Sequence, residues 1–520
     1  MNKSIFQFFR KFELDKLVLL ACILIYFIIG ILLVQNYLYV FTTDTISYIH
    51  VAQHYINGIF PQAINGYWSP LFSWLLIPFL TIWPGKLGAL YSIKILNLII
   101  GCFTFFSLYL LEDKLKFDIR IKTVTFVILI PITLYFAYSN SVPDLLVLTL
   151  LLFYINFLLD NRYLHNLQMG VLTGFFGALA FLSKSYAFFF FIVHFMVVNI
   201  DYWLKFKENR KIITKNFILG LMIFLAISGI WVALISDKYD KLTIGTAGTY
   251  NHDIFGPRSQ GDPVYYDGLL KPYDEYATSA WDDPSYIKVK GWSPFSSINN
   301  FNFQLAFIVY NTFEIFKIIE KFSILSILII ILALFLIFKS NNKLKNKLTL
   351  LTLTVFIYLA GYSLLIVEIR YLWFVDVLLL IMGILCVKIL SEDYSIRKSL
   401  SMILVFLICW SFVFFPILSL YDVSGDGKDI YVLAQDLKKQ GIEGNNMASR
   451  TDLGHTLILA YYLDAKYYGL TRLYSGNETS EVLFNNNIKY YFSMQKDRIE
   501  IPGYKIIDTG YNNPLVYQPG

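Results

Sequence analysis

Long apolar runs dominate this sequence, and their length constrains the fold more than any other feature. A helix needs roughly 20 apolar residues to cross the hydrocarbon core of a membrane. Runs of about this length lie near residues 17–41, 87–111, 122–138, 143–159, 167–182, 186–204, 214–236, 320–338, 347–367, 371–389 and 399–420. With 57% hydrophobic and only 15% charged residues, the chain exceeds what a soluble core needs. We therefore predict an all-α polytopic membrane domain, residues 1–420, with about eleven transmembrane helices.

The charges of the connecting loops predict how these helices are oriented. Lys and Arg gather in the cytoplasmic loops of membrane proteins, and segments such as KFKENRKIITK and KSNNKLKNK alternate with loops that are nearly free of both. The N-terminus is therefore expected in the cytoplasm. An odd number of crossings then places the loops 41–86 and 237–317, and the C-terminal region, outside. The net charge of +6 is modest and does not indicate a nucleic-acid partner. The many apolar runs indicate a multi-pass cell-membrane protein whose partner is membrane lipid.

Residues 421–520 are less apolar and predict a second, extracytoplasmic domain. Helical patterns at 426–441, 451–464 and 479–487 alternate with strand-like pieces at 447–449, 488–494, 504–508 and 514–518. This alternation is typical of a small α/β domain. No glycine-rich phosphate-binding motif occurs there, so the sequence indicates no nucleotide site. The four cysteines lie in apolar runs, where we expect small core residues and not disulfide partners.

The first outer loop, from Phe41 to Leu80, contains no Lys or Arg and is crowded with polar and aromatic side chains. A threonine or Asp44 can cap a helix start here. The apolar residues that follow predict an amphipathic helix that lies on the membrane surface, with Asp44 at its head. Gly58 and Pro61 are expected to end this helix.

Charged side chains gather where the outer ends of the helices are expected. They are Asp44, Asp144, Lys184, Glu368 and Arg370. A charge at the edge of the hydrocarbon layer is costly unless it is paired or used, so this convergence predicts a polar cavity that opens outward. Lys94 and Asp376 lie one to two helical turns deeper, where we expect them to be able to pair with each other.

Several stretches occur in an order that resembles known enzymes. Asp44 is followed by Tyr48, Ala52, Gly58 and YWSPLFSWLL, then by SVPDLLVLTLLLFYINFLL, GVLTGFFGALAFLSKSYAFFFF and EIRYLWFVDVLLL. Taken together they resemble the GT-C superfamily of membrane glycosyltransferases, near the branch of protein O-mannosyltransferases and lipid A aminoarabinose transferases (glycosyltransferase family 39). Many relatives carry two adjacent acids in the first loop, whereas Thr45 follows Asp44 here. This departure speaks against a mechanism that relies on two adjacent carboxylates.

The resemblance implies transfer of a sugar from a dolichyl or undecaprenyl phosphate donor to a glycan, lipid or protein acceptor on the outer face of the membrane. Asp44 is then the expected general base, and Asp144 a second acid that orients substrate or Lys184. Lys184 and Arg370 lie on the correct side to neutralise the departing phosphate. Further substrate contacts are predicted at Tyr48, His54, Tyr67, Arg258 and Glu368.

Each of these side chains has a structural alternative. Asp44 could serve only as a helix cap, and Asp144 could start its own helix in the same way. Lys184 and Arg370 could reach lipid headgroups, while Glu368 could simply pair with either cation. Tyr48 and Tyr67 could belong to an aromatic belt at the membrane interface.

The sequence leaves the metal requirement and the exact function open. His50 and His54 have the four-residue spacing of many zinc ligands, but no third ligand lies nearby. No cofactor or metal site is therefore predicted, and a divalent cation requirement stays open. The competing functions are a transporter or flippase of a lipid-linked or anionic solute, and a glycan ligase or polymerase that uses a lipid-linked donor.

Overall fold

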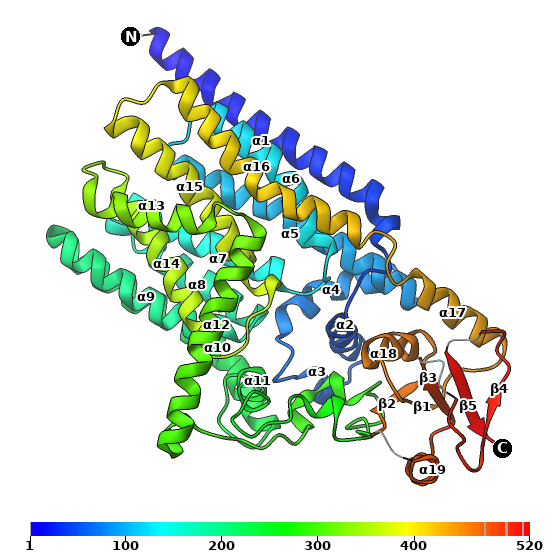
Figure 1. The fold of residues 1–520 in the computed structure, drawn as a ribbon. Coiled ribbons are helices and arrows are strands. Elements are labelled where there is room, and N and C mark those ends of the chain that lie inside the picture. The colour runs from blue at the N-terminus through cyan, green and yellow to red at the C-terminus, as the bar shows by residue number, and fades with distance from the viewer. Residues whose placement is uncertain (1, 473–474, 495–497, 512–513) are drawn as a thin grey trace.

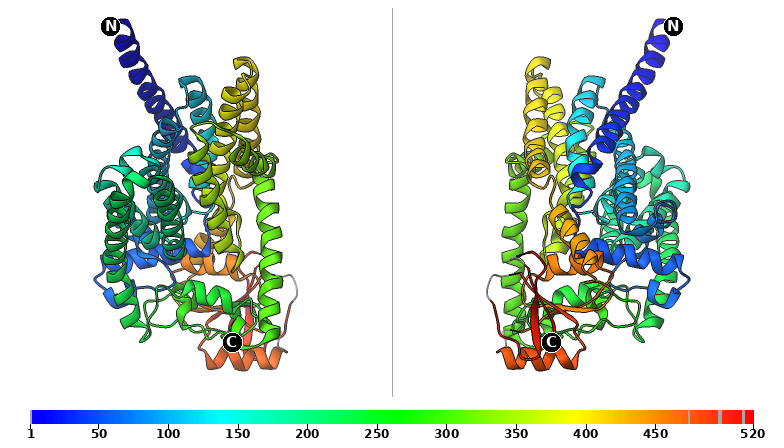
Figure 2. Two further views of the ribbon diagram at one scale, coloured as in Figure 1. Left: turned by 90° about the vertical axis from the view of Figure 1, so that its left-hand side faces the viewer. Right: turned by 90° about the vertical axis from the view of Figure 1, so that its right-hand side faces the viewer.

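The structure is a computed structural model that describes residues 2–472, 475–494, 498–511 and 514–520. Long helices form a bundle, and a smaller domain of strands and helices packs against one end of it (Figure 1). The N-terminus lies at the far end of the bundle and the C-terminus lies in the small domain (Figure 2). The predicted combination of a helical membrane domain with a C-terminal α/β domain is confirmed.

Seven helices within the described residues are long and apolar enough to cross a membrane. They are α1 (Asn2–Tyr37), α5 (Gly85–Lys114), α6 (Ile119–Tyr138), α9 (Tyr186–Lys205), α10 (Arg210–Lys238), α15 (Trp373–Asp393) and α16 (Lys398–Asp422). Helices α12 (Ile298–Phe322) and α13 (Ser326–Lys339) are bent by 104° at the break between them, and they add an eighth span only where the bent pair is counted as one. The chain is thus a multi-pass membrane protein, while the expected count of eleven spans and the cytoplasmic N-terminus stay predictions.

Shorter helices fill the spaces between these spans. They are α4 (Pro70–Ile82), α7 (Asp144–Leu159), α8 (Gln168–Ser183) and α14 (Lys345–Ser363), with the 3₁₀ turns η1 (Asn161–Leu164), η2 (Lys207–Asn209) and η7 (Ile369–Leu372). Each of the eleven predicted apolar runs contains a helix, although α7 and α8 are too short to qualify as spans by length alone.

Glycines let α8 and α10 approach closely. A Cβ atom on Gly174 would overlap the carbonyl oxygen of Gly220, and one on Gly170 would lie 2.6 Å from the carbonyl oxygen of Asn216. Small residues at helix contacts are typical of membrane bundles, where close packing replaces the hydrophobic driving force. The glycines that interrupt the apolar run near 167–182 therefore serve helix packing.

The helix predicted in the first loop forms as α2 (Thr43–Ile56), but the expected amphipathic pattern with a single buried side is wrong, while its place on the membrane surface stays a prediction. Its residues from Thr45 to Ala52 are buried, and it packs against α4 and against α18 (Leu453–Tyr462) of the C-terminal domain. The reason is that small and apolar side chains occur on every face of this segment, so no face is left for solvent. A single turn, α3 (Phe60–Ala63), follows it.

The second loop that the sequence analysis placed outside, here called the second outer segment, spans residues 239–297 and is irregular, as its turn-rich composition predicts. It contains α11 (Ala247–Asp253) and the 3₁₀ turns η3 (Pro263–Tyr265), η4 (Ala280–Asp282), η5 (Pro284–Tyr286) and η6 (Pro294–Ser296). It ends earlier than the predicted residue 317, because α12 already begins at Ile298.

The C-terminal domain contains a five-stranded sheet among its described residues, in the order β2-β1-β3-β5-β4. Its elements are α17 (Lys428–Lys439), β1 (Asn446–Ser449), α18 (Leu453–Tyr462), β2 (Lys466–Leu470), α19 (Gly476–Asn485), β3 (Tyr490–Ser493), β4 (Tyr504–Ile507) and β5 (Leu515–Pro519). Strand β1 pairs in parallel with β2 and β3, whereas β5 is antiparallel to β3 and β4. The sequence analysis missed β2, a short edge strand that follows α18 directly.

The second outer segment covers this edge strand. The Tyr467 amide donates to the carbonyl of Thr278, and the Leu270 amide donates to the carbonyl of Tyr468, each over 2.7 Å. An exposed strand edge is a site of unwanted pairing, so the loop satisfies β2 and is itself held by it. On the other side, Asp464 forms an ion pair of 3.2 Å with Lys86 at the start of α5. The domain is thereby attached to both the loop and the bundle.

Candidate active site

The site is built around one large cavity between the bundle and the outer segments. Its volume is about 1780 Å³, and its walls come from α2, the starts of α7 and α9, α11, α12 and the segment between α14 and α15. All five charged residues that the sequence analysis placed at the outer rim line this cavity. The structure therefore brings together Asp44, Asp144, Lys184, Glu368 and Arg370, which come from four separate parts of the chain.

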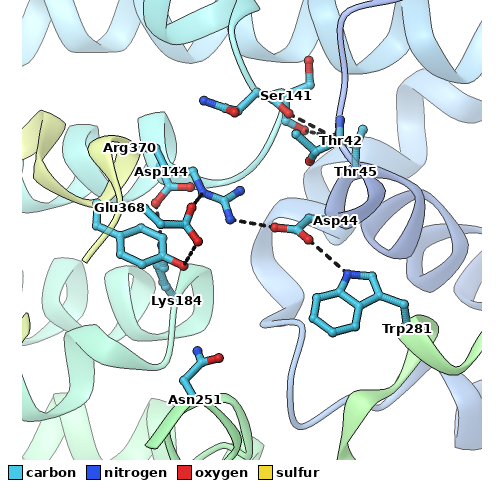
Figure 3. A network of polar contacts seen from close by, with 12 residues as sticks. Thr42, Asp44, Thr45, Ser141, Asp144, Lys184, Asn251, Trp281, Glu368 and Arg370 are labelled. Atoms are coloured by element: carbon cyan, nitrogen blue, oxygen red, sulfur yellow. Dashed lines mark hydrogen bonds and ion pairs between the residues drawn. The ribbon is translucent and has the colours of Figure 1, made fainter. Parts of the chain in front are cut away.

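Asp44 lies in the first turn of α2 and is held from two sides. Its Oδ2 accepts a hydrogen bond from Arg370 Nη2 at 2.8 Å, and its Oδ1 accepts one from the indole Nε1 of Trp281 at 3.1 Å. Figure 3 shows the carboxylate between these two donors. Both the Asp44 and Arg370 side chains are 14% exposed, so the pair is largely shielded from water and is worth more than a surface pair.

Arg370 also contacts a second acid. Its Nε donates to Oε2 of Glu368 at 2.8 Å, and the hydroxyl of Tyr371 donates to the other Glu368 oxygen at 3.3 Å. The guanidinium thus lies between Glu368 and Asp44, as Figure 3 shows. The structural alternative of a Glu368–Arg370 pair is present in the structure, and Glu368 lines the cavity as well.

Lys184 and Asp144 form the second charge pair of the cavity. Asp144 is the first residue of α7, and its Oδ1 lies 2.5 Å from the Lys184 ammonium, which follows the end of α8. The ammonium also lies 3.6 Å from the centre of the Tyr371 ring, a cation–π contact. Burial lowers the pKa of Lys184, and the neighbouring Asp144 opposes part of this shift.

Trp281 is a site residue that the sequence analysis missed. It belongs to the short turn η4, whose backbone is bonded on several sides: Trp281 O accepts from Ser47 Oγ and from Trp68 Nε1, each at 3.1 Å. The next residue, Asp282, lies 3.1 Å from His50 Nδ1 and accepts from the Thr278 amide at 2.6 Å. The only sequence signal was the clustering of aromatic and acidic residues in the second outer segment, which did not single out this tryptophan.

The aromatic residues predicted to bind substrate have different environments. Tyr67 lines the cavity, and its hydroxyl donates to Oδ1 of Asn251 at 3.4 Å. Tyr48 also lines it but is almost fully buried, in contact with the rings of Trp68 and Phe72. Burial raises the pKa of both tyrosines well above the ordinary value, so both hydroxyls stay protonated donors.

Two predicted substrate contacts do not reach the cavity. His54 is buried against Tyr276 on the side of α2 that faces away from the lining, and Arg258 is exposed at the surface of the second outer segment. The reason for His54 is the helical turn: a residue ten positions after Asp44 points in another direction. His50 is engaged by Asp282, and the described residues hold no group of three or more His, Cys, Asp or Glu side chains that could bind a metal.

The expected pairing of Lys94 with Asp376 is also wrong. The Lys94 ammonium donates to the carbonyls of Val40 and Tyr138, at 2.5 and 3.3 Å, and to Ser141 Oγ at 2.6 Å. The carboxylate of Asp376 is buried without a hydrogen-bond partner among the described residues. Backbone carbonyls at the ends of α1 and α6 satisfy Lys94 instead, which the sequence spacing could not show.

One side of the cavity is apolar and open at the surface. Large hydrophobic side chains that line the cavity are also exposed there: Phe189, Leu242, Phe295, Phe301, Leu305 and Leu364. They come from α9, α12 and the loops beside them. In a membrane protein, an exposed apolar rim of this kind is suited to contact with lipid.

Comparison with solved structures identifies the fold. The chain is similar to the apo oligosaccharyltransferase of Archaeoglobus fulgidus, with 13% identity and a TM-score of 0.52 over 91% of this chain and 69% of that one. It is similar as well to ArnT from Cupriavidus metallidurans bound to undecaprenyl phosphate, with 10% identity and a TM-score of 0.52 over 96% and 97% of the two chains. The chain has a GT-C fold. The resemblance seen in the sequence is thus confirmed at the level of the fold, although no family model and no curated protein matches the sequence.

Proposed function

We propose that this protein is a membrane glycosyltransferase that moves a sugar from a polyprenyl phosphate donor to an acceptor on the outer face of the membrane. One observation carries the proposal. A single cavity combines an exposed apolar rim with a polar end at which Asp44, Arg370, Glu368, Lys184 and Asp144 meet. A lipid-linked phosphate needs both environments, because its phosphate is charged and its polyprenyl chain is apolar.

The two cations suit the donor phosphate. Arg370 offers a planar fork of N–H donors that matches phosphate oxygens, and Lys184 adds a compact point charge. Both cations are already held in place by carboxylates, so little side-chain freedom is lost when the donor binds. The polyprenyl chain would lie along the apolar rim. The similar ArnT structure contains undecaprenyl phosphate, which supports a donor of this class.

Asp44 is the proposed general base. As the acceptor hydroxyl attacks the anomeric carbon, its proton passes to a carboxylate oxygen of Asp44. The bond between the anomeric carbon and the phosphate oxygen breaks, and its electron pair stays on the phosphate beside Lys184 and Arg370. A positioned base contributes about 10²–10⁴-fold, and stabilisation of the leaving phosphate by nearby cations adds to this.

The residue after Asp44 does not supply a second acid. Thr45 Oγ1 donates to the carbonyls of Asn140 and Ser141, at 3.1 and 3.3 Å, and so helps to join α2 to the loop before α7. Two other acids of the cavity, Glu368 and Asp144, already have cationic partners. We therefore propose a mechanism with one catalytic carboxylate, in which Asp144 positions Lys184.

The test is sugar transfer by the purified full-length protein from a panel of polyprenyl-phosphate sugars, comparing wild type with Asp44→Asn. The substitution keeps the side-chain shape while it removes the charge, so transfer should fall by at least about 100-fold. Asp118→Asn is the matched control, because Asp118 also stands at a helix start, where it accepts from the amides of Arg120 and Ile121. It should leave transfer unchanged.

Two outcomes would overturn the proposal. Full transfer by a folded Asp44→Asn variant would remove Asp44 as the base. Movement of the intact lipid-linked sugar between leaflets, without transfer to any acceptor, would favour a flippase instead.

A further inference from the structure

The charges that line the cavity are unequally divided. Among the described residues of the lining there are five carboxylates but only one Lys and one Arg. Both cations lie at the polar end, where Arg370 contacts Asp44 and Glu368 and Lys184 contacts Asp144. The other two carboxylates, Asp253 and Asp262, have neither Lys nor Arg as a partner within the described structure.

Asp262 belongs to the same compartment as the proposed base. Its Oδ1 accepts from the hydroxyl of Tyr250 at 2.6 Å and from the Val264 amide at 3.1 Å. The ring of Tyr67 packs on the rings of Tyr250 and Trp281, with centroids 5.6 and 5.7 Å apart, and these two residues donate to Asp262 and to Asp44, respectively. An acceptor that approaches Asp44 therefore also meets the negative charge of Asp262.

Asp253 ends α11 and stands beside an aromatic wall. Its Oδ1 lies 3.4 Å from Nδ1 of His252, whose ring stacks on Trp292 with centroids 4.4 Å apart and an angle of 6°. Trp292 Nε1 donates to the carbonyl of His252 at 2.9 Å, which fixes this arrangement. All three residues line the cavity.

Further aromatic faces are available near these acids. Tyr265 lines the cavity and is 66% exposed, and Trp281 forms another part of the wall. Carboxylates accept hydrogen bonds from hydroxyl groups, and flat aromatic faces cover apolar surface at a small cost in side-chain entropy. A wall that combines the two suits a molecule with many hydroxyls and an apolar C–H face, which is the chemistry of a sugar ring.

We infer that the acceptor is an uncharged glycan, and that the carboxylates of Asp253 and Asp262 exclude phosphorylated or otherwise anionic acceptors. This inference rests on the proposed function, which assigns both cations of the cavity to the donor phosphate. Among the described lining residues, no Lys or Arg is then left for a second anion. Like charges placed together in a shielded site weaken binding strongly.

The test compares matched acceptors with the full-length protein and its polyprenyl-phosphate sugar donor. The probes are neutral methyl glycosides and their 6-phosphates, and the measurements are kcat/KM for transfer and binding by quenching of tryptophan fluorescence. For each neutral glycoside that is used as an acceptor, we expect kcat/KM to be higher than for its 6-phosphate by roughly tenfold or more. The preference should narrow as ionic strength rises, because salt screens the repulsion.

A double variant, Asp253→Asn with Asp262→Asn, should reduce the preference severalfold while the neutral glycosides are still used. The side-chain amide introduced by Asp262→Asn retains a carbonyl oxygen that can accept from Tyr250 and Val264. Asp267→Asn is the matched control, because Asp267 lies in the same outer segment but pairs with Arg472 outside the cavity. It should leave the preference unchanged.

The possible results separate the two claims. A phosphate that is used or bound as well as its neutral partner, a preference that the double variant leaves intact, or no binding of any neutral glycoside would each overturn the inference. Selective binding of neutral glycosides without any transfer would instead count against the proposed function and preserve the charge preference.

Discussion

The contact between Trp281 and Asp44 allows a sharp prediction about catalysis. Trp281 donates its indole N–H to Oδ1 of Asp44, and the turn that holds it is bonded to α2, to the first loop and, through Thr278, to strand β2. Trp281→Phe removes this donor but keeps an aromatic ring for the contacts with Tyr67 and Trp68. Asp44 then keeps Arg370 alone, so its carboxylate is free to rotate away from the acceptor.

The size of the effect follows from the kind of bond that is lost. A hydrogen bond to a charged group contributes about 1.5–3 kcal/mol, and each 1.36 kcal/mol in the barrier is a factor of ten in rate. If the whole bond serves to position Asp44, kcat falls by roughly 10- to 150-fold. KM for the donor lipid should stay near the wild-type value, because the cations that bind phosphate are unchanged.

The assay is steady-state transfer with the donor lipid varied, alongside thermal unfolding. Trp231→Phe is the matched control: Trp231 is buried in α10, packs on Trp74 and does not line the cavity. It should lower stability without changing kcat. The reasoning is refuted if Trp281→Phe keeps kcat within twofold of wild type, or if only KM changes.

Three further predictions concern stability. Gly174→Val should destabilise the α8–α10 contact by about 1–3 kcal/mol or more, because its Cβ would overlap the Gly220 carbonyl. Gly229→Val is the control and should be tolerated, because nothing lies within 4 Å of a Cβ at this position. Equal melting temperatures of the two variants would contradict the prediction. Burial lowers the pKa of His54, so the unfolded chain binds a proton before the folded protein does as the pH falls. The melting temperature should therefore decrease as the pH falls below about 6.5. His54→Gln should reduce this decrease, and a variant with the same pH dependence of the melting temperature as wild type would refute the prediction. Lys86→Met should cost at most about 1 kcal/mol, because the Asp464 side chain with which Lys86 pairs is 54% exposed. A larger loss in denaturant unfolding would show that the docking of the domain depends on this pair.

Features that depend on local patterns could be predicted from the sequence. Apolar runs predicted helices in the right places because burial in lipid requires a continuous apolar segment whatever its neighbours are. The convergence of Asp44, Asp144, Lys184, Glu368 and Arg370 could also be predicted, because the parity of membrane crossings places loops on one side before any contact is known. The ordered motifs led to the GT-C fold for the same reason, since each motif is short and lies within one segment.

Only the tertiary structure decided which groups touch. The bond from Trp281 to Asp44 joins residues 237 positions apart, and it depends on a loop that pairs with an edge strand of another domain. Lys94 bonds to backbone carbonyls rather than to Asp376. This contact could not be predicted, because the carbonyls left unbonded at helix ends have no signature in the sequence. The burial of α2 likewise depends on α4 and α18 closing over it. Sequence periodicity determines which faces are apolar, whereas the packing of distant segments determines what covers them.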